Sequence, residues 1–144
     1  MYELLIVFIT FLLMEFISWA THKYIMHGFL WNLHKDHHQV DHSKFTQKND
    51  WFFLIFAIPS ILLISYDIKN LTLLFFIGVG IACYGFAYII VHEIIIHKRL
   101  PFLQRLKGNY IKTIRRAHRI HHKTKGKYGA SCFGMLIVPK KYWV

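Results

Sequence analysis

The chain has 144 residues, 55% of them hydrophobic, and a formal net charge of +11 from 18 Lys and Arg against 7 Asp and Glu. This length suits one domain, and the hydrophobic content excludes an intrinsically disordered chain. The two cysteines, Cys83 and Cys132, are too few for a disulfide scaffold or a cysteine zinc finger.

Three apolar blocks predict three membrane-spanning helices, at residues 2–20, 51–66 and 71–91. A span needs about 20 mostly apolar residues, which the third block provides fully and the first nearly so. The second block is shorter and contains Pro59, which membrane helices tolerate. Because the blocks are apolar on every face, buried helices of a soluble protein are disfavoured.

The first block is interpreted as part of the folded protein and not as a cleaved signal peptide. Its leading region contains Glu3 but no Lys or Arg, and no small-x-small cleavage motif follows it.

The basic residues predict the orientation in the membrane. Seventeen of the eighteen Lys and Arg lie in segments 21–50 and 92–144, and the short link after the second block holds only Lys69. Three spans place both segments on one side, and the positive-inside rule makes that side the cytoplasm. Such a basic collar suits anionic lipid head groups or an acidic partner protein. Nucleic acid is disfavoured, because the basic residues are not interleaved with exposed aromatic side chains.

Ten of the eleven histidines form two matched sets. In each set an apolar block is followed by a pair spaced five residues apart and then by a triplet with spacings of three and one. The sets are His22, His27, His34, His37 and His38, and then His92, His97, His118, His121 and His122. His42 lies outside this pattern and is interpreted as a surface residue, as is the adjacent Asp41.

The spacings predict a metal centre. Positions i, i+3 and i+4 share one helical face, so each triplet presents three imidazoles to one side. A five-residue spacing turns about 140° on a regular helix, so each pair must straddle a helix end or a local distortion. Neutral imidazole binds Zn, Cu, Fe and Ni, and ten imidazoles exceed the needs of one ion. We therefore expect two metal ions beside the membrane.

Other polar residues near these motifs are candidates to support the site. Metal-binding histidines usually donate their second N–H to a carboxylate or carbonyl group. The candidates for this supporting role are Glu15, Asp36, Asn49, Asp50 and Glu93. Tyr84 and Tyr88 lie two turns and one turn before His92, respectively, and are candidates for lining a substrate cleft or for packing.

The motifs together resemble those of the membrane fatty acid hydroxylase superfamily, with the nearest similarity to its bacterial β-carotene 3-hydroxylase branch. The resembling stretches are EFISWATHKYIMHGFLWNLHKDHH at 15–38, NDWFFLIFAIPSILL at 49–63, GVGIACYGFAYIIVHEIIIHKR at 78–99, RRAHRIHH at 115–122 and YGASCFGML at 128–136. The resemblance covers nearly the whole chain, and so predicts a single hydroxylase domain at 1–144. Members of the branch are often assigned four spans. The expected fold is thus an all-α integral membrane protein with three to four transmembrane helices and a cytoplasmic histidine-rich di-metal cap.

The resemblance implies a non-haem di-iron mono-oxygenase of a bacterial inner membrane. It implies two Fe ions held by the ten patterned histidines, O2 as co-substrate and insertion of one oxygen atom at C3 of a β-ionone ring. β-Carotene would become zeaxanthin by way of β-cryptoxanthin. The chain has no flavin or nicotinamide motif, so an external electron donor is expected, with a ferredoxin-type protein docking on the basic face.

Three alternatives stay open at this point. A fatty acid or sterol hydroxylase or desaturase shares the histidine pattern and its chemistry. A membrane metal- or haem-binding electron carrier would place paired histidines inside facing spans, whereas these lie at and beyond the span ends. A metal transporter would need polar groups throughout its spans, and the third block has few.

Overall fold

The computed structural model describes residues 2–39, 46–103 and 105–144, and no strand occurs among them. The α-helices are α1 (Tyr2–Ala20), α2 (Trp31–His38), α3 (Phe52–Asp67), α4 (Leu73–Tyr88) and α5 (Asn109–His122). Shorter helical segments are η1 (Thr21–Phe29), η2 (Lys48–Trp51), η3 (Ile89–Ile96) and η4 (Lys140–Tyr142). The predicted all-α fold is confirmed. The surface positions predicted for Asp41 and His42 lie outside the described residues.

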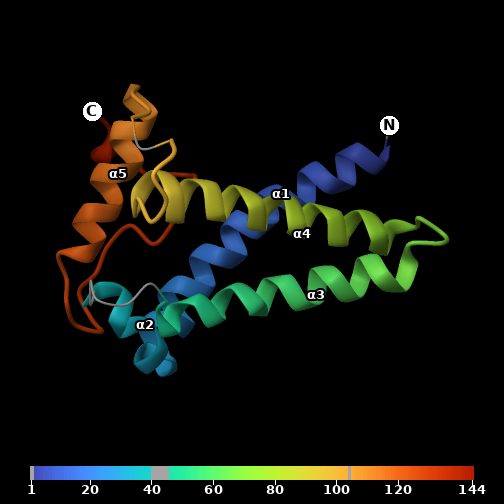
Figure 1. Cartoon of the computed structure of the whole chain (residues 1–144), viewed down its shortest axis with the longest axis horizontal. Coiled ribbons are helices and arrows are strands. Elements are labelled where there is room, and N and C mark those ends of the chain that lie inside the picture. Colours follow the sequence, from blue (N-terminus) through green and yellow to red (C-terminus); the bar gives the residue numbers. More distant parts are fainter. Residues whose placement is uncertain (1, 40–45, 104) are drawn as a thin grey trace.

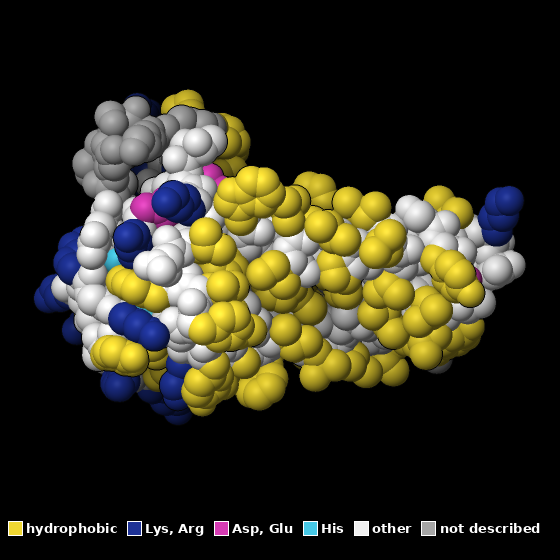
Figure 2. Space-filling view, turned by 90° about the horizontal axis from the view of Figure 1, so that it is seen from below, with side chains coloured by type: hydrophobic (Ala, Val, Ile, Leu, Met, Phe, Trp, Pro, Cys, Tyr) yellow, Lys and Arg dark blue, Asp and Glu magenta, His cyan; other side chains and the backbone are white. Residues whose placement is uncertain are grey.

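Three helical stretches are long and apolar enough to cross a membrane: Tyr2–Phe29, which is kinked at Gly28, Lys48–Asp67 and Leu73–Ile96. Figure 1 shows α3 and α4 as an antiparallel hairpin with α1 crossing beside α4, while α2 and α5 gather at one end. Apolar side chains cover the long body in Figure 2, and Lys and Arg cluster at that same end. The three predicted spans are therefore present. The first and third continue beyond their predicted ends at 20 and 91, because helical structure runs on through the histidine pairs.

The helices approach closely at two glycines of α4. A Cβ atom on Gly80 would lie 2.6 Å from the Thr10 Cβ of α1, and one on Gly78 would lie 2.9 Å from the Ile64 Cγ1 of α3. The Ser60 hydroxyl donates to the Gly78 carbonyl at 2.8 Å, which adds a buried polar contact between α3 and α4. Small residues of this kind let membrane helices pack at short distance.

Asp67 sets where the third span begins. Its carboxylate accepts from the backbone N–H groups of Thr72 at 2.9 Å and Phe75 at 3.2 Å, and from the Thr72 hydroxyl. These contacts satisfy N–H groups that have no partner within the first turn of a helix. The helix therefore begins at Leu73, two residues after the predicted start at 71.

A small apolar core fixes α5 beyond the spans. It joins Ile95 of η3 and Ile114 and Ala117 of α5 to Val138 and Tyr142 near the C-terminus. We call residues 124–144 the C-terminal tail. This core holds the second histidine triplet and the tail against the end of the third span.

Candidate metal centre

Both histidine pairs lie at π-helical segments. His22 and His27 are in η1, and His92 is in η3 with His97 as the residue that follows it. The His97 N–H donates to the His92 carbonyl at 2.9 Å, an i to i+5 bond that defines the π-helix. The ring centroids lie 5.3 Å apart in the first pair and 4.5 Å apart in the second. The local distortion expected from the five-residue spacing is thus a π-helix, which brings positions i and i+5 together.

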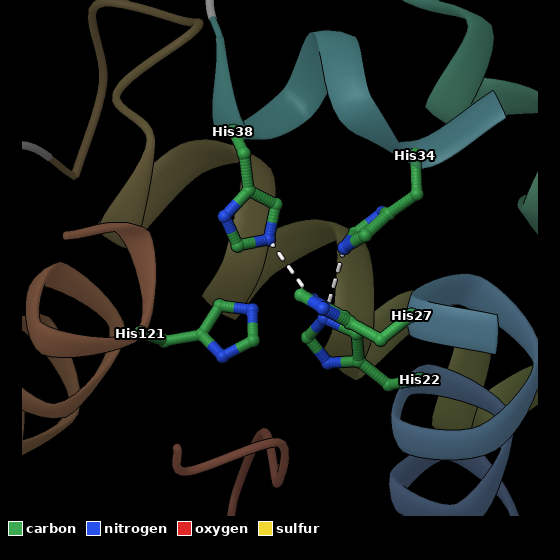
Figure 3. A group of neighbouring side chains, drawn as sticks. All are labelled: His22, His27, His34, His38 and His121. Atoms are coloured by element: carbon green, nitrogen blue, oxygen red, sulfur yellow. Dashed lines mark hydrogen bonds between the residues drawn. The ribbon is translucent and has the colours of Figure 1, made fainter. Parts of the chain in front are cut away.

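The imidazoles form two groups of potential metal ligands. Within each group one ligand nitrogen per residue lies within 4.8 Å of all the others. Group A comprises His22, His27, His34, His38 and His121, and group B comprises His37, His97, His118 and His122. Figure 3 shows the five rings of group A converging from η1, α2 and α5.

The middle histidine of each triplet belongs to the other triplet's group. His37 of α2 joins the α5 histidines of group B, and His121 of α5 joins the α2 histidines of group A. Helix geometry explains this exchange. At about 100° per residue, positions i and i+4 lie about 40° apart, whereas i+3 lies about 60° from i on the other side. One triplet can therefore face two centres, with its first and last members toward one and its middle member toward the other.

His92 adjoins group B without being counted in it. Its ring centroid lies 4.9 Å from that of His37, 4.5 Å from that of His97 and 4.7 Å from that of His118. Its Nδ1 lies 2.6 Å from Glu93 Oε1. The structure thus gathers all ten patterned histidines into one cluster.

Side chains orient three of these rings through Nδ1. The Nδ1 atom of His34 lies 2.6 Å from Asn49 Oδ1, and that of His37 lies 3.0 Å from Gln47 Oε1. Glu93 Oε1 is the corresponding partner of His92 Nδ1. A proton on Nδ1 donated to these oxygens leaves the Nε2 lone pair directed inward. Asn49 and Glu93 therefore contact histidines, as expected for supporting residues. Sequence analysis missed Gln47, which no motif distinguishes from a surface residue.

Four backbone carbonyls of the tail orient most of group A. The Nδ1 atoms of His22, His27, His38 and His121 lie 2.8–3.0 Å from the carbonyl oxygens of Phe133, Lys127, Thr124 and Ser131, respectively. Sequence analysis missed these partners, because a carbonyl group belongs to every residue type and leaves no pattern in the sequence. The only signal was the likeness of residues 128–136 to the tail of the hydroxylase superfamily.

Among the described residues, the Asp36 and Asp50 carboxylates form no hydrogen bond with a histidine ring and instead brace the segment that carries Gln47 and Asn49. Asp36 Oδ2 accepts from the Lys48 N–H at 2.6 Å, and Asp50 Oδ2 accepts from the Gln47 N–H at 2.9 Å. Both carboxylates therefore lie one contact further from the rings than expected.

Arg99 ties two of the supporting carboxylates together. Its Nη1 lies 2.9 Å from Asp50 Oδ1 and 3.0 Å from Glu93 Oε2. The beginning of the second span is thereby joined to the end of the third beside His92. Sequence analysis did not single out Arg99.

Glu15 lies away from the rings and holds the tail. The carboxylate is buried, and its Oε1 accepts from three consecutive backbone N–H groups, those of Met135, Leu136 and Ile137, each at 2.9 Å. Its Oε2 accepts from the Tyr84 hydroxyl at 2.7 Å. Gly134 lets the tail turn tightly around this carboxylate, since a Cβ atom at Gly134 would lie 2.8 Å from the Ile137 carbonyl oxygen. We call this arrangement the Glu15 latch.

Tyr84 and Tyr88 border a space of only about 40 Å³ between α1, α3 and α4. Tyr84 is buried on the Glu15 latch, and the ring centroid of Tyr88 lies 4.8 Å from that of His92. Tyr88 is thus near the centre and Tyr84 belongs to the latch, and the space that both residues border is too small for a substrate ring.

The donor atoms suit metal ions. Burial lowers the pKa of His34 and His97 to about 3 and that of His38 to about 4, with neighbouring imidazoles acting in the same direction. The rings are therefore neutral, which is the form that binds metal. The Nε2 atoms of His121 and His122 are buried without a hydrogen-bond partner. A buried polar atom left unpaired is costly, and a bound cation would satisfy these lone pairs.

Comparison with known proteins agrees with this chemistry. The family described as fatty acid hydroxylase matches residues 7–138. A β-carotene hydroxylase of Pantoea ananas is 42% identical over 135 residues, covering 94% of this chain and 77% of the relative. A β-carotene hydroxylase of Paracoccus sp. (strain PC1) is 34% identical over 140 residues, covering 96% of this chain and 86% of the relative. The chloroplastic β-carotene 3-hydroxylase 1 of Arabidopsis thaliana is 34% identical over 132 residues, which are 89% of this chain and 42% of that protein. No solved structure matches the chain significantly.

Proposed function

The chain belongs to the fatty acid hydroxylase family, and on this premise we propose that it is a β-carotene 3-hydroxylase that inserts one oxygen atom of O2 at C3 of each β-ionone ring. β-Carotene becomes zeaxanthin by way of β-cryptoxanthin. The observation that carries the proposal is the pair of neighbouring all-imidazole groups, in a chain whose relatives are β-carotene hydroxylases.

Two iron ions are the proposed cofactors, one held by group A and one by group B together with His92. When bound, the pair of metals supplies the redox chemistry that activates O2 for attack on an unactivated C–H bond. Each hydroxylation consumes one O2, two electrons and two protons, and it yields the alcohol and one water molecule. The protein's part is to keep the imidazoles neutral by burial and to fix their rings through the Nδ1 partners.

The placement of the site suits a hydrocarbon substrate. The histidine cluster lies at one end of the three spans, where a carotenoid dissolved in the bilayer can reach it without crossing water. We propose that this end, with the C-terminus, faces the cytoplasm of a bacterial cell, because the basic residues gather there (Figure 2). We also propose that residues 1–144 form a single domain.

Electrons are proposed to enter beside group B from an acidic ferredoxin-type protein. A polar hollow of about 250 Å³ is lined by His97, His118 and His122 together with Lys98, Arg115 and Arg119. The hollow therefore brings positive side chains and group B to one surface. Opposite charge on the partner would steer its docking there.

Pigment analysis of a β-carotene-producing host that expresses this chain tests the function. We expect zeaxanthin to accumulate with the wild-type chain and to be absent with His121→Ala, while His42→Ala behaves as wild type. Unchanged β-carotene together with altered fatty acids or sterols would reject the carotenoid substrate and favour another hydroxylase of the family. Zeaxanthin formed at the original rate by His121→Ala would reject the metal site.

A further inference from the structure

A cavity of about 450 Å³ lies between α1 and the C-terminal tail. Its lining is mainly apolar, with Leu12, Phe16 and Trp19 on the helix side and Phe133 and Ile137 among the tail residues. The Glu15 latch holds these two walls together. The volume is within the range of about 300–1,000 Å³ that is typical of sites for small organic ligands.

The cavity ends beside group A. The ring centroid of Phe133 lies 5.5 Å from that of His22 and 5.2 Å from those of His27 and His121. Phe133 therefore lines the cavity and also contacts three metal-ligand candidates. A ligand that fills the cavity comes within one aromatic side chain of the metal centre.

Two residues that line the cavity also lie on the exposed surface of the first span. Leu12 and Phe16 are 47% and 64% exposed on the outer face of α1, within the first span. An apolar chain can pass from the lipid tails into the cavity without exposure to water, which removes the main cost of moving it. Lys23 and Lys141 also border the cavity, and their charges suit the head-group region.

Two other spaces between the described helices lack this combination. A cavity of about 200 Å³ between α3 and α4 is apolar, but none of its lining residues makes a ring contact with a described histidine, as Phe133 does in the cavity beside α1. The space beside Tyr84 and Tyr88 is near the centre, but it measures only about 40 Å³. The cavity between α1 and the tail combines volume, apolar walls, lipid-exposed residues of the first span and a wall residue, Phe133, that contacts group A.

We propose that this cavity seats the terminal ring of the carotenoid, with the polyene chain lying along the outer face of α1 in the bilayer. Phe133 is then the wall that determines which ring carbon faces group A. This assignment rests on the proposed function and extends it from a substrate class to a binding site.

A matched pair of substitutions on α1 tests the assignment. Leu12 lines the cavity, whereas Leu13, its neighbour, is 56% exposed and lines no part of it. Leu12→Trp places a large side chain in the cavity and should weaken β-carotene binding by about tenfold or more. Leu13→Trp places the same side chain toward lipid and should change binding by less than about twofold. Ile137→Trp fills the cavity from the tail side and should act like Leu12→Trp.

Binding is measured on the metal-loaded protein in lipid nanodiscs without a reductant. β-Carotene has no circular dichroism of its own, so the signal that it gains in a chiral site reports binding without turnover. Metal content and far-UV circular dichroism show whether each variant is folded and loaded. Equal affinities for the Leu12 and Leu13 variants, or wild-type affinity for Ile137→Trp, would overturn the assignment. If Leu12→Trp loses metal, Ile137→Trp decides the question. If the wild-type protein binds β-carotene but never hydroxylates it, the proposed function is rejected. The cavity assignment is then still decided by the affinities of the variants for β-carotene.

Discussion

The Tyr84 hydroxyl of α4 donates to Glu15 Oε2 of α1 at 2.7 Å, although the two residues are 69 positions apart in the sequence. The other oxygen of the same carboxylate accepts three backbone N–H groups of the tail. One buried side chain therefore joins two spans to the segment whose carbonyl groups orient group A. Glu15 has no contact with a histidine ring in the described hydrogen bonds, so its influence on the metals would be indirect.

Loss of the Glu15 latch should empty group A before group B. Glu15→Ala removes the acceptor for the tail N–H groups, so the carbonyls that face four group A histidines lose their fixed position. Loss of such outer partners typically lowers metal affinity by about 10–100-fold. We expect one metal ion per chain in place of two, measured by elemental analysis after dialysis, together with faster amide exchange in residues 131–137. Tyr84→Phe, which keeps the carboxylate, is the milder control. Equal loss from both groups, or a full metal complement with a loosened tail, would show that the latch does not act on group A.

Asn49 should control how firmly His34 holds metal. Its Oδ1 accepts from His34 Nδ1 at 2.6 Å in a buried site. Asn49→Ala removes that acceptor, and we expect the iron concentration for half-maximal activity to rise by about 10–100-fold while the maximal rate is largely regained at saturating iron. Asn49→Asp retains an acceptor oxygen and should stay near wild type. An Asn49→Ala rate that iron cannot restore would indicate a general packing defect.

The metal-free protein should lose stability as the pH falls. The pKa values of His34, His38 and His97 are about 3–4 in the folded chain, against about 6.5 in an unfolded chain. Between these values the unfolded chain binds more protons, so unfolding becomes more favourable with each step toward acid. Each such histidine contributes about 1.4 kcal/mol per pH unit in this window. The unfolding midpoint in detergent should therefore be constant above about pH 7 and fall steeply from about pH 6.5 toward pH 4. A midpoint that is level across this window would contradict the buried, neutral state of the rings.

Reversal of charge beside group B should impair a protein reductant and spare a small one. Arg119 is exposed at the polar hollow that His97, His118 and His122 line. Arg119→Glu should raise the KM for an acidic ferredoxin by about tenfold at low salt, and the difference should shrink as salt screens the charges. Lys69→Glu, at the other end of the spans, should leave that KM unchanged. With dithionite as donor, both variants should match wild type. An Arg119→Glu rate that falls equally with dithionite would place the defect in the metal centre.

Much of this structure was predictable from the positions of the apolar residues and the histidines, because residue type alone defines these patterns. Three apolar blocks gave the spans, and the spacings of the ten histidines gave a cluster with two centres. The division of the histidines between groups A and B was not predictable from their spacing, because it depends on how α2 and α5 face each other across the site. The tail's part in the site was also hidden, since it supplies carbonyl groups and an apolar wall and no distinctive side chain. Glu15 was expected to support the histidine rings, but its partners are the Tyr84 hydroxyl and three backbone N–H groups more than a hundred residues away.

The exchange of His37 and His121 has a consequence for assembly. Group A takes four histidines from the first half of the chain and one from the second, and group B takes three from the second half and one from the first. Each site therefore takes ligands from both halves of the chain, and each bound ion would hold α2 and α5 together. In the wild-type chain, where both sites are intact, the first ion to bind would bring these helices to the separation that the second ion requires. Loading would then be cooperative, and a singly loaded wild-type chain would be a minor species.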